Sequence, residues 1–302
     1  MEHLLIETKD LSIQFKNFVA NNKINIRIYS GRIHAIAGEN GAGKSTLMKL
    51  LYGVYQATEG EIYIDGERVK THSPSVSAEK GIGMVFQDFR LIRSFTVLEN
   101  IYLSLKEYGK IFHKKELKGK IKVLCEKYGI NVDLDKYVYQ LDLGECQQIE
   151  ILKVLLRENN RLLIFDEPTA VLTPQEIDEL MMIMKDLAKE GKSIIFITHK
   201  LNEIKAVANR CTILRKGKYI GTVDVASTSA EKLSELMVGR KVNFIVEKDE
   251  PQIGDAVLEV KDLCYKPAHS SKNVLNNVSF NVRRGEIVCI AGIDGNGQTE
   301  LV

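Results

Sequence analysis

The residues best suited to chemistry form the stretch GENGAGKS at positions 38–45. It fits the pattern G-x-x-x-x-G-K-[ST], with the apolar segment RIHAIA before it and the helical pattern KSTLMKLLYGV overlapping its end. Glycines let backbone N–H groups surround phosphate oxygens, and the start of a helix adds a favourable dipole. Lys44 would then reach the terminal phosphates of a nucleotide, and Ser45 would ligate Mg²⁺.

Two other interpretations of this stretch are a glycine-rich turn before a helix and a dinucleotide-binding loop. The combination of strand, lysine and hydroxyl favours a phosphate-binding loop over a plain turn. The dinucleotide motif has no use for Lys44 and Ser45 at these positions. We therefore expect the stretch to bind the phosphates of a nucleotide.

Two carboxylates follow another apolar segment about 120 residues later, in LLIFDEP. Asp166 at the end of such a strand is placed to hold Mg²⁺, usually through water. Glu167 beside it is placed to polarise an attacking water, as a general base must. An Asp-Glu pair after a strand is also a common way to open a loop. Together with the phosphate loop, the pair predicts a nucleotide-hydrolysing site.

Gln87 and His199 also stand where apolar segments end, after GIGMVF and SIIFIT. Taken alone, they would be a surface amide and a loop or helix-capping histidine. Beside a phosphate loop, both side chains can approach a γ-phosphate. Phe15 precedes the phosphate-binding strand, and the sequence leaves open whether its ring stacks on a base or packs in the core.

The elements that must position these residues follow an α/β pattern. RLLIFD, SIIFIT and CTILRKG are apolar strands, and PQEIDELMMIMKDLAKEG is a helical pattern between the first two. This order predicts parallel strands with helical crossovers. EIYIDGERV predicts a hairpin with an Asp-Gly turn. Residues 96–160 are mainly helical and Lys-rich, with Leu117, Ile121, Leu124 and Tyr128 on one face and the lysines of HKKELKGKIK on a solvated one.

The beginning of the chain is repeated near its end. AGENGAGKSTLM (37–48) matches AGIDGNGQTELV (291–302), and LIETKDL (5–11) matches VLEVKDL (257–263). Both halves are expected to run strand, loop, alternating strand, turn, short apolar strand, glycine-rich loop. In the second glycine-rich loop Gln298 replaces the lysine, and its other matching positions are Gly292, Gly297 and Thr299. We expect a first domain at 1–240, a linker at 241–256 and the N-terminal part of a second domain at 257–302.

Composition and termini exclude several classes of protein. A net charge of +2 is too small to indicate a nucleic-acid or membrane-surface protein by itself. The five cysteines are scattered without a CxxC pair, which is typical of reduced thiols in a cytosolic protein. The N-terminus has no signal-peptide pattern, and the sequence has no run of about 18 apolar residues. A membrane role would therefore need a partner chain.

With these motifs, the whole chain resembles the ATP-binding subunits of ATP-binding-cassette (ABC) importers, in the subfamily with two fused cassettes that serves simple sugars and nucleosides. Two segments, EPTAVLTPQE and LMVGR, resemble sequences typical of that subfamily. Two others, GIGMVFQDF and GIDGNGQTEL, resemble its nucleoside branch more than its ribose or galactose branch. The resemblance implies a P-loop NTPase cassette of ABC type. Such a cassette has a RecA-like parallel-sheet core, an antiparallel β subdomain and a helical signature subdomain, here at about 88–160.

The resemblance also implies a role for each candidate residue. Phe15 matches the adenine-stacking aromatic, Gln87 the Q-loop glutamine that senses Mg²⁺ and the permease, Asp166 the Walker B aspartate, Glu167 the catalytic glutamate and His199 the switch histidine. The Walker A loop, which binds ATP, is matched by Gly38, Asn40, Gly41, Ala42, Gly43, Lys44, Ser45 and Thr46. Ser45, Gln87 and Asp166 would surround Mg²⁺.

Two positions depart from the pattern of the family. The signature loop, typically Leu-Ser-x-Gly-Glu or Leu-Ser-Gly-Gly-Gln, is here formed by Leu141, Asp142, Leu143, Gly144 and Glu145. Asp142 thus replaces the serine that should face a γ-phosphate. The second departure is Gln298; a degenerate second Walker A is usual in the subfamily, whereas an aspartate in the signature is not. In head-to-tail closure of two cassettes, both departures would fall in one composite site.

The resemblance predicts an ATPase on the cytoplasmic face of a membrane, working with a transmembrane permease, an extracytoplasmic solute-binding protein and a second cassette of the same chain or a second copy. No nucleic-acid partner is expected. A soluble tandem cassette factor acting on ribosomes is one alternative, although it would usually have a long charged linker and two intact sites. A non-catalytic nucleotide-binding module, with Asp142 marking lost activity, is another.

Overall fold

The computed structural model describes residues 3–70, 72–106, 113–157, 159–241, 251–268, 272–292 and 296–302. They form two compact units, Met1–Val242 and Asn243–Val302. Of the expected linker at 241–256, residues 242–250 lie outside the described residues. Among the helices that the structure describes, none combines the length and apolarity needed to cross a bilayer.

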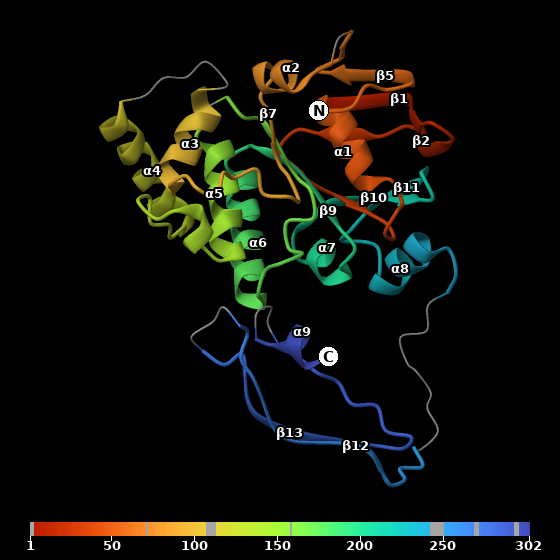
Figure 1. Cartoon of the computed structure of the whole chain (residues 1–302). Helices are drawn as coiled ribbons and strands as arrows, with labels where there is room; N and C mark the ends of the chain where they lie inside the picture. Colours follow the sequence, from red (N-terminus) through yellow and green to blue (C-terminus); the bar gives the residue numbers. More distant parts are fainter. Residues whose placement is uncertain are drawn as a thin grey trace. The chain divides into compact units, whose positions relative to one another are not determined.

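The first unit is built of both strands and helices (Figure 1). In chain order they are β1 (Leu4–Phe15), β2 (Phe18–Ile24), β3 (Arg27–Tyr29), β4 (Ile33–Ala37), α1 (Lys44–Tyr52), β5 (Glu59–Ile64), β6 (Glu67–Arg68), α2 (Pro74–Glu79), β7 (Ile82–Val85), α3 (Val97–Lys106), α4 (Lys114–Tyr128), the short 3-10 helix Val138–Gln140, α5 (Leu143–Leu155), β8 (Leu162–Phe165), α6 (Pro174–Lys189), β9 (Ser193–Thr198), α7 (Leu201–Val207), β10 (Arg210–Arg215), β11 (Lys218–Asp224) and α8 (Ala230–Val238).

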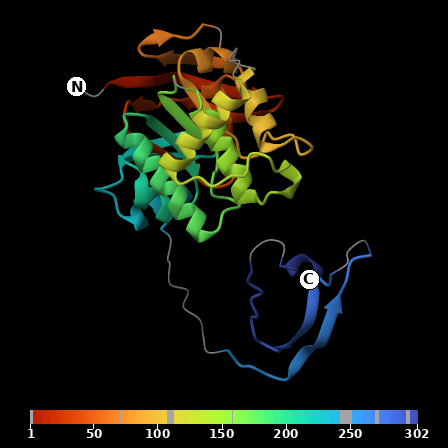
Figure 2. The ribbon, with the colours of Figure 1, turned by 90° about the vertical axis from the view of Figure 1, so that its left-hand side faces the viewer.

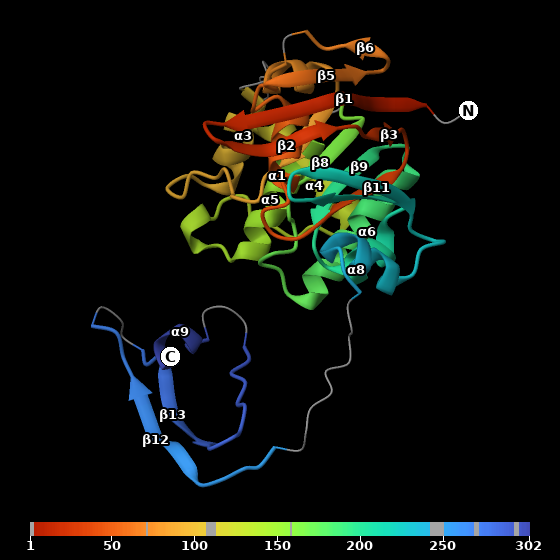
Figure 3. The same ribbon diagram turned by 90° about the vertical axis from the view of Figure 1, so that its right-hand side faces the viewer.

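One mixed sheet of eleven strands runs through this unit, in the order β6-β5-β1-β2-β11-β10-β4-β9-β8-β7, with β3 paired to β1. The five strands β10, β4, β9, β8 and β7 pair in parallel. The strands β1, β2, β3, β5 and β6 pair antiparallel and lie next to one another (Figure 3). The predicted α/β class is therefore confirmed, as are the parallel strands and the hairpin whose turn is Asp65-Gly66.

The parallel strands β4, β7, β8 and β9 are buried along their whole length because helices cover both of their faces. All five residues of β4 are buried. Ala35 and Ala37 face the core cluster that contains α6, whereas Ile36 faces the cluster that contains α1, as the two-residue period of a strand requires. A Thr173–Glu176 capping box with Pro174 at the first position starts α6. The carboxyl ends of the parallel strands are thereby fixed between two hydrophobic cores.

The helical region between β7 and β8 packs against the parallel side of the sheet, and Figure 2 shows its yellow and green helices in front of the strands. Helix α5 contacts α3, α4 and β7. Leu117 and Ile121 are buried, and Leu124 and Tyr128 pack partly buried against the same cluster. The predicted apolar face is confirmed.

The second unit contains β12 (Ala256–Tyr265), β13 (Leu275–Arg283), which pair antiparallel, and α9 (Gln298–Leu301). The sequence predicted a short apolar strand between the turn and the second glycine-rich loop, and this prediction is wrong, since residues 286–292 form no strand. In the first unit the matching strand, β4, pairs with both β9 and β10. Within the described part of the second unit no such neighbours exist, and Ile287 is 83% exposed. Without partners for its N–H and C=O groups, the segment does not become a strand.

Candidate active site

The phosphate loop lies between β4 and α1 and is built on glycines with positive φ. Gly38, Gly41 and Gly43 have φ of 155°, 77° and 93°. At Gly43 a Cβ atom would lie 2.5 Å from the backbone oxygen of Ala20, because β2 runs directly beside the loop. Asn21 of β2 donates from Nδ2 to the backbone oxygen of Gly43 at 3.1 Å. The contacts with β2 thus fix the backbone conformation of the loop at Gly43.

These glycines give a prediction with an internal control. Gly41→Ala meets no atom within 4 Å, so it should cost only the strain of positive φ, about 1–2 kcal/mol. Gly43→Ala has the same strain and also clashes with backbone, which should add roughly 1–3 kcal/mol. The midpoint of thermal unfolding should therefore fall clearly further for Gly43→Ala. Equal midpoints for the two variants would contradict the contact between the loop and β2.

Lys44 is buried at the start of α1, with 4% of its surface exposed. Its Nζ donates to the backbone oxygens of Gly38 at 2.9 Å and Glu39 at 3.0 Å. Burial lowers the pKa of Lys44, while the charges of Glu167 and Asp166 oppose that change. Nζ lies 3.7 Å from Oε1 of Glu167. A desolvated ammonium held by neutral carbonyls is a strong partner for a phosphate oxygen.

Ser45 and Asp166 bring the loop and the end of β8 together. The hydroxyl of Ser45 donates to Oδ1 of Asp166 at 2.7 Å, and burial raises the pKa of Asp166. At the end of β7, Gln87 donates from Nε2 to Oε2 of Glu167 at 3.4 Å. A hydroxyl, a carboxylate and an amide are the oxygen donors that suit Mg²⁺, which is usually held by one or two carboxylates together with phosphates. The arrangement therefore fits a magnesium nucleotide.

The strand ends gather these groups on one edge of the sheet. β7, β8 and β9 are neighbours and run in parallel, so Gln87, Glu167 and His199 follow the same carboxyl edge. Glu167 has φ of 49°, which is strained for a residue with a side chain and is found mainly where function requires it. His199 is exposed directly after β9. This edge lies beside the phosphate loop because β9 also pairs with β4.

The remaining residues of the expected nucleotide site lie at the end of β1 and in or next to the phosphate loop. Phe15 ends β1 with 41% of its surface exposed, so it lies outside the core. Its ring meets the ring of Tyr55 edge-on, with centroids 5.2 Å apart. In the phosphate loop Asn40 is exposed and Ala42 is buried, and Thr46 is half-buried in the first turn of α1.

The signature segment 141–145 stands at the start of α5 and not at the strand ends. Asp142 is the N-cap: its Oδ1 accepts from the backbone N of Glu145 at 2.7 Å. In return, Oε2 of Glu145 accepts from the backbone N of Asp142 at 3.1 Å. Leu141 precedes this capping box, Leu143 is 39% exposed and Gly144 is buried against Glu176. The aspartate thus has a structural role at the beginning of a helix.

The second glycine-rich loop has the same local geometry where it is described. Gly297 has φ of 89° and precedes α9, which begins with Gln298 and Thr299. The side chain of Gln298 lies against Gly292, so that a Cβ there would overlap its Nε2. Residues 293–295 lie outside the described residues. Gln298 thus has an uncharged amide where the first loop has the ammonium of Lys44.

The structure adds residues that sequence reasoning missed. Asn21 supports the phosphate loop, and its sequence context gives no signal for this. Lys200 and Glu203 form an ion pair at 3.2 Å beside His199. Their spacing of three residues at the start of a helix was a usable signal, because such pairs face each other.

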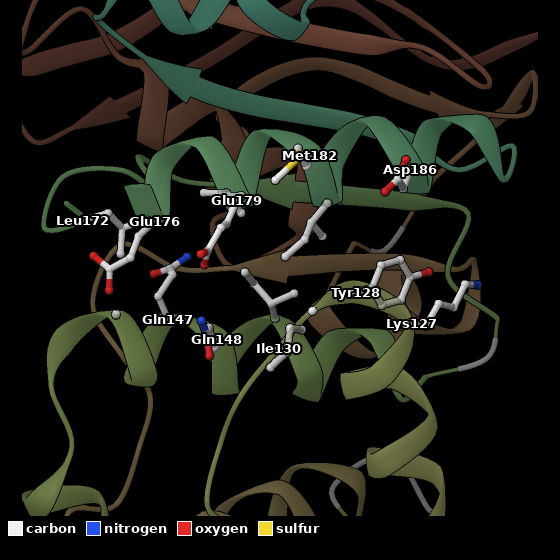
Figure 4. A pocket seen from close by; sticks show the side chains of 15 residues that line it. Lys127, Tyr128, Ile130, Gln147, Gln148, Leu172, Glu176, Glu179, Met182 and Asp186 are labelled. Carbon is white, nitrogen blue, oxygen red and sulfur yellow. The ribbon is translucent and has the colours of Figure 1, made fainter. Parts of the chain in front are cut away.

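A cavity of about 290 Å³ lies between α4, α5 and α6. Figure 4 shows Gln147 on one wall and Glu176 and Glu179 on the facing helix α6. The residues that line it include none of the strand-end groups. It is therefore separate from the candidate active site.

Known proteins match both the sequence and the fold. Residues 21–170 match the family model described as ABC transporter. The chain is 52% identical to the nucleoside import ATP-binding protein NupA of Lactococcus lactis subsp. cremoris, with 99% of this chain and 59% of that protein covered. It is 47% identical to the guanosine import ATP-binding protein NupO of Bacillus subtilis, with 100% and 59% covered. The chain thus spans about 59% of the length of these relatives.

Among solved structures, the chain is similar to a bacterial ABC transporter cassette whose structure is dimeric. The two share 25% sequence identity with a TM-score of 0.67, and the match covers 73% of this chain and 99% of that one. Another similar structure is the cassette cbiO1 from Clostridium perfringens, part of the ABC transporter complex cbiONQ. It is 26% identical with a TM-score of 0.65, and 79% of this chain and 97% of that one are covered.

Proposed function

This chain carries a domain of the ABC transporter family over residues 21–170, and we propose that it is the ATP-hydrolysing energy subunit of an importer. The observation that carries the proposal is the hydrogen bond of 2.7 Å between Ser45 and Asp166. It joins the phosphate loop to the strand end that bears Glu167, and so supports the proposal that one site contains the phosphate-binding, cation-binding and base groups. Two nucleoside importer relatives near 50% identity support the same assignment.

The proposed reaction is hydrolysis of ATP to ADP and phosphate. Lys44 and the N–H groups of the phosphate loop would hold the phosphates and neutralise charge that develops on them. Glu167 would orient the attacking water and accept its proton, with Gln87 holding the carboxylate from one side. Ser45, Gln87 and Asp166 would hold Mg²⁺, which would supply positive charge against the phosphates. His199, at the end of β9, would contact the γ-phosphate.

The proposed active form contains two cassettes closed head-to-tail, each nucleotide lying between one Walker A loop and the opposite signature. The partner cassette is the second domain proposed to begin near residue 257, or a second copy. The site built on Lys44 and Glu167 would hydrolyse ATP. The other, which combines Gln298 with Asp142, would not. The similarity to a cassette that is dimeric supports this closure.

The proposed partners are a transmembrane permease, at whose cytoplasmic face this subunit would lie, and through it an extracytoplasmic solute-binding protein. We expect no nucleic-acid partner. Nucleosides are the favoured solute class, because NupA and NupO are nucleoside and guanosine import proteins. Other relatives are named for sugars, among them the glucose import protein TsgD13 of Haloferax volcanii at 42% identity.

Reconstitution with candidate permeases and binding proteins tests the proposal through phosphate release. Nucleosides should stimulate ATPase activity, and ribose or glucose should leave it at the basal rate. Stimulation by sugars without stimulation by nucleosides would reject the nucleoside assignment and leave the importer assignment standing. Phosphate release that no permease alters, together with co-sedimentation with ribosomes, would reject the importer assignment.

A further inference from the structure

Lys200, the residue after His199, connects two loops of the site. Its Nζ donates to the backbone oxygen of Thr169 at 3.1 Å and to Thr169 Oγ1 at 3.4 Å. Thr169 is buried and follows Glu167 by two positions. The ammonium therefore joins the loop after β9 to the loop that carries the proposed general base.

Glu203 holds this ammonium from the other side. Its carboxylate is 5% exposed, and Oε1 lies 3.2 Å from Nζ of Lys200. Its Oε2 accepts from Oγ1 of Thr198 at 2.5 Å, and that Oγ1 in turn accepts from the backbone N of Lys200 at 3.0 Å. Both sequence neighbours of His199 are thus tied to one buried carboxylate. A buried carboxylate is stable only beside an opposite charge and hydrogen-bond donors. Loss of the Lys200 ammonium would therefore leave the charge of Glu203 uncompensated.

The two connected loops carry the groups whose relative position matters for hydrolysis. His199 is exposed, and Glu167 has a strained backbone with φ of 49° that the surrounding structure must hold. The Lys200 ammonium is partly exposed, at 39%, but its hydrogen bonds to Thr169 end on a buried residue. A hydrolytic site is sensitive to such ties, because displacing a catalytic group by about 1 Å can cost 10²-fold in rate.

We propose that Lys200, supported by Glu203, is a positioning residue that sets the place of His199 relative to Glu167. The proposal rests on the ATPase function proposed above. Both residues act through the loops and not on the reacting atoms. Their loss should therefore lower the rate of ATP cleavage without a comparable loss of nucleotide affinity.

The test compares Lys200→Met, Lys200→Arg and the control Lys205→Met. Lys205 is a matched control because it lies on α7, which begins directly after Lys200, and its Nζ also donates two hydrogen bonds, to the backbone oxygens of Val225 and Thr228, both at 2.9 Å. Neither partner belongs to the site. The readouts are the single-turnover rate of ATP cleavage with protein in excess, and the Kd for Mg-ATP. Amide hydrogen exchange of residues 167–170 and 198–200 is a third readout that needs no turnover.

Lys200→Met should slow cleavage about 10- to 100-fold while Kd changes by less than about twofold. Exchange should rise in both loops together, and Lys200→Arg, which keeps the charge and the donors, should restore most of the rate. Lys205→Met should leave all three readouts at wild-type values. The proposal would be overturned if Lys200→Met cleaved ATP at the same rate as Lys205→Met, or if the amide hydrogens of its two loops exchanged at the same rate as in Lys205→Met. The cleavage rates are compared in protein with a complete second cassette. If the wild type in that form bound but never cleaved ATP, the ATPase function would be refuted, and hydrogen exchange alone would then decide whether Lys200 connects the loops.

Discussion

Glu167→Gln is expected to bind Mg-ATP as the wild type does and to lose ATP turnover by a factor of about 10²–10⁴. The glutamate is the carboxylate that follows Asp166 at the end of β8, 3.7 Å from the ammonium of Lys44. Glutamine has nearly the same shape and keeps a hydrogen bond with Gln87 within reach, but it cannot accept a proton from water. Solute-stimulated phosphate release from the reconstituted importer measures the lost ATP turnover, and equilibrium binding of Mg-ATP measures the retained affinity.

The matched control for this change is Glu39→Gln. Glu39 lies exposed in the phosphate loop, where its backbone oxygen, not its carboxylate, accepts from Lys44. The substitution removes the same charge from the same site and should leave turnover at the wild-type rate. Equal turnover by wild type and Glu167→Gln would remove Glu167 from the proposed catalytic role. An equal loss in Glu39→Gln would show that net charge, and not proton transfer, explains the effect.

Asp142→Ser is expected to have opposite effects in two forms of the protein. When copies of the 302-residue chain pair head-to-tail, Asp142 must face the Lys44 loop. A carboxylate about 4 Å from a phosphate charge costs roughly 4 kcal/mol at an effective dielectric near 20, so ATPase activity should be very low and Asp142→Ser should raise it. In a protein with a complete second cassette, Asp142 would instead face Gln298 in the proposed closure. There Asp142→Ser should hardly alter ATPase activity, whereas Lys44→Ala should abolish it.

The structure indicates that Asp142→Ser removes the charge and keeps the helix cap. Asp142 caps α5 through its bond with the backbone N of Glu145, and serine and asparagine are equally good N-caps. Folding should therefore be nearly unaffected, and Asp142→Asn separates the charge from the size of the side chain. If charge is the cause, Asp142→Asn should raise activity of the chain alone as Asp142→Ser does. Robust ATPase activity of the unmodified chain, or a large gain from Asp142→Ser beside a complete second cassette, would contradict the assignment of two unequal sites.

Local chemistry made much of this fold predictable from the sequence. The continuous apolar runs of β4, β8 and β9 indicate strands buried on both faces, and the capping residues before α6 mark its beginning. The phosphate loop needs its own glycines, lysine and hydroxyl, so its type was visible in eight consecutive residues. Placing Gln87 near Glu167 required only the rule that parallel strands end on one edge of a sheet.

What the sequence did not reveal depends on distant partners. The segment 287–291 has the apolar pattern of β4, but a strand also needs neighbours, and pattern alone does not supply them. Asn21 reaches Gly43 only because β2 passes the phosphate loop, and Lys200 meets Thr169 across 31 positions of the chain. From the sequence, Asp142 was recognised only as a charged residue at a position where the family has serine. That it also caps a helix follows from the backbone geometry at the start of α5.

Binding of Mg-ATP to the 302-residue chain, measured calorimetrically for wild type and Lys44→Ala, tests the central claim most directly. Lys44 is buried with its ammonium bonded to two loop carbonyls, and hydrogen bonds to a charged group are worth about 1.5–3 kcal/mol. Wild type should bind saturably, Lys44→Ala should bind at least about tenfold more weakly, and the distant control Lys205→Ala should bind as wild type. Equal affinity of wild type and Lys44→Ala, or no binding by the wild type, would contradict the assignment of residues 38–45 as the ATP site.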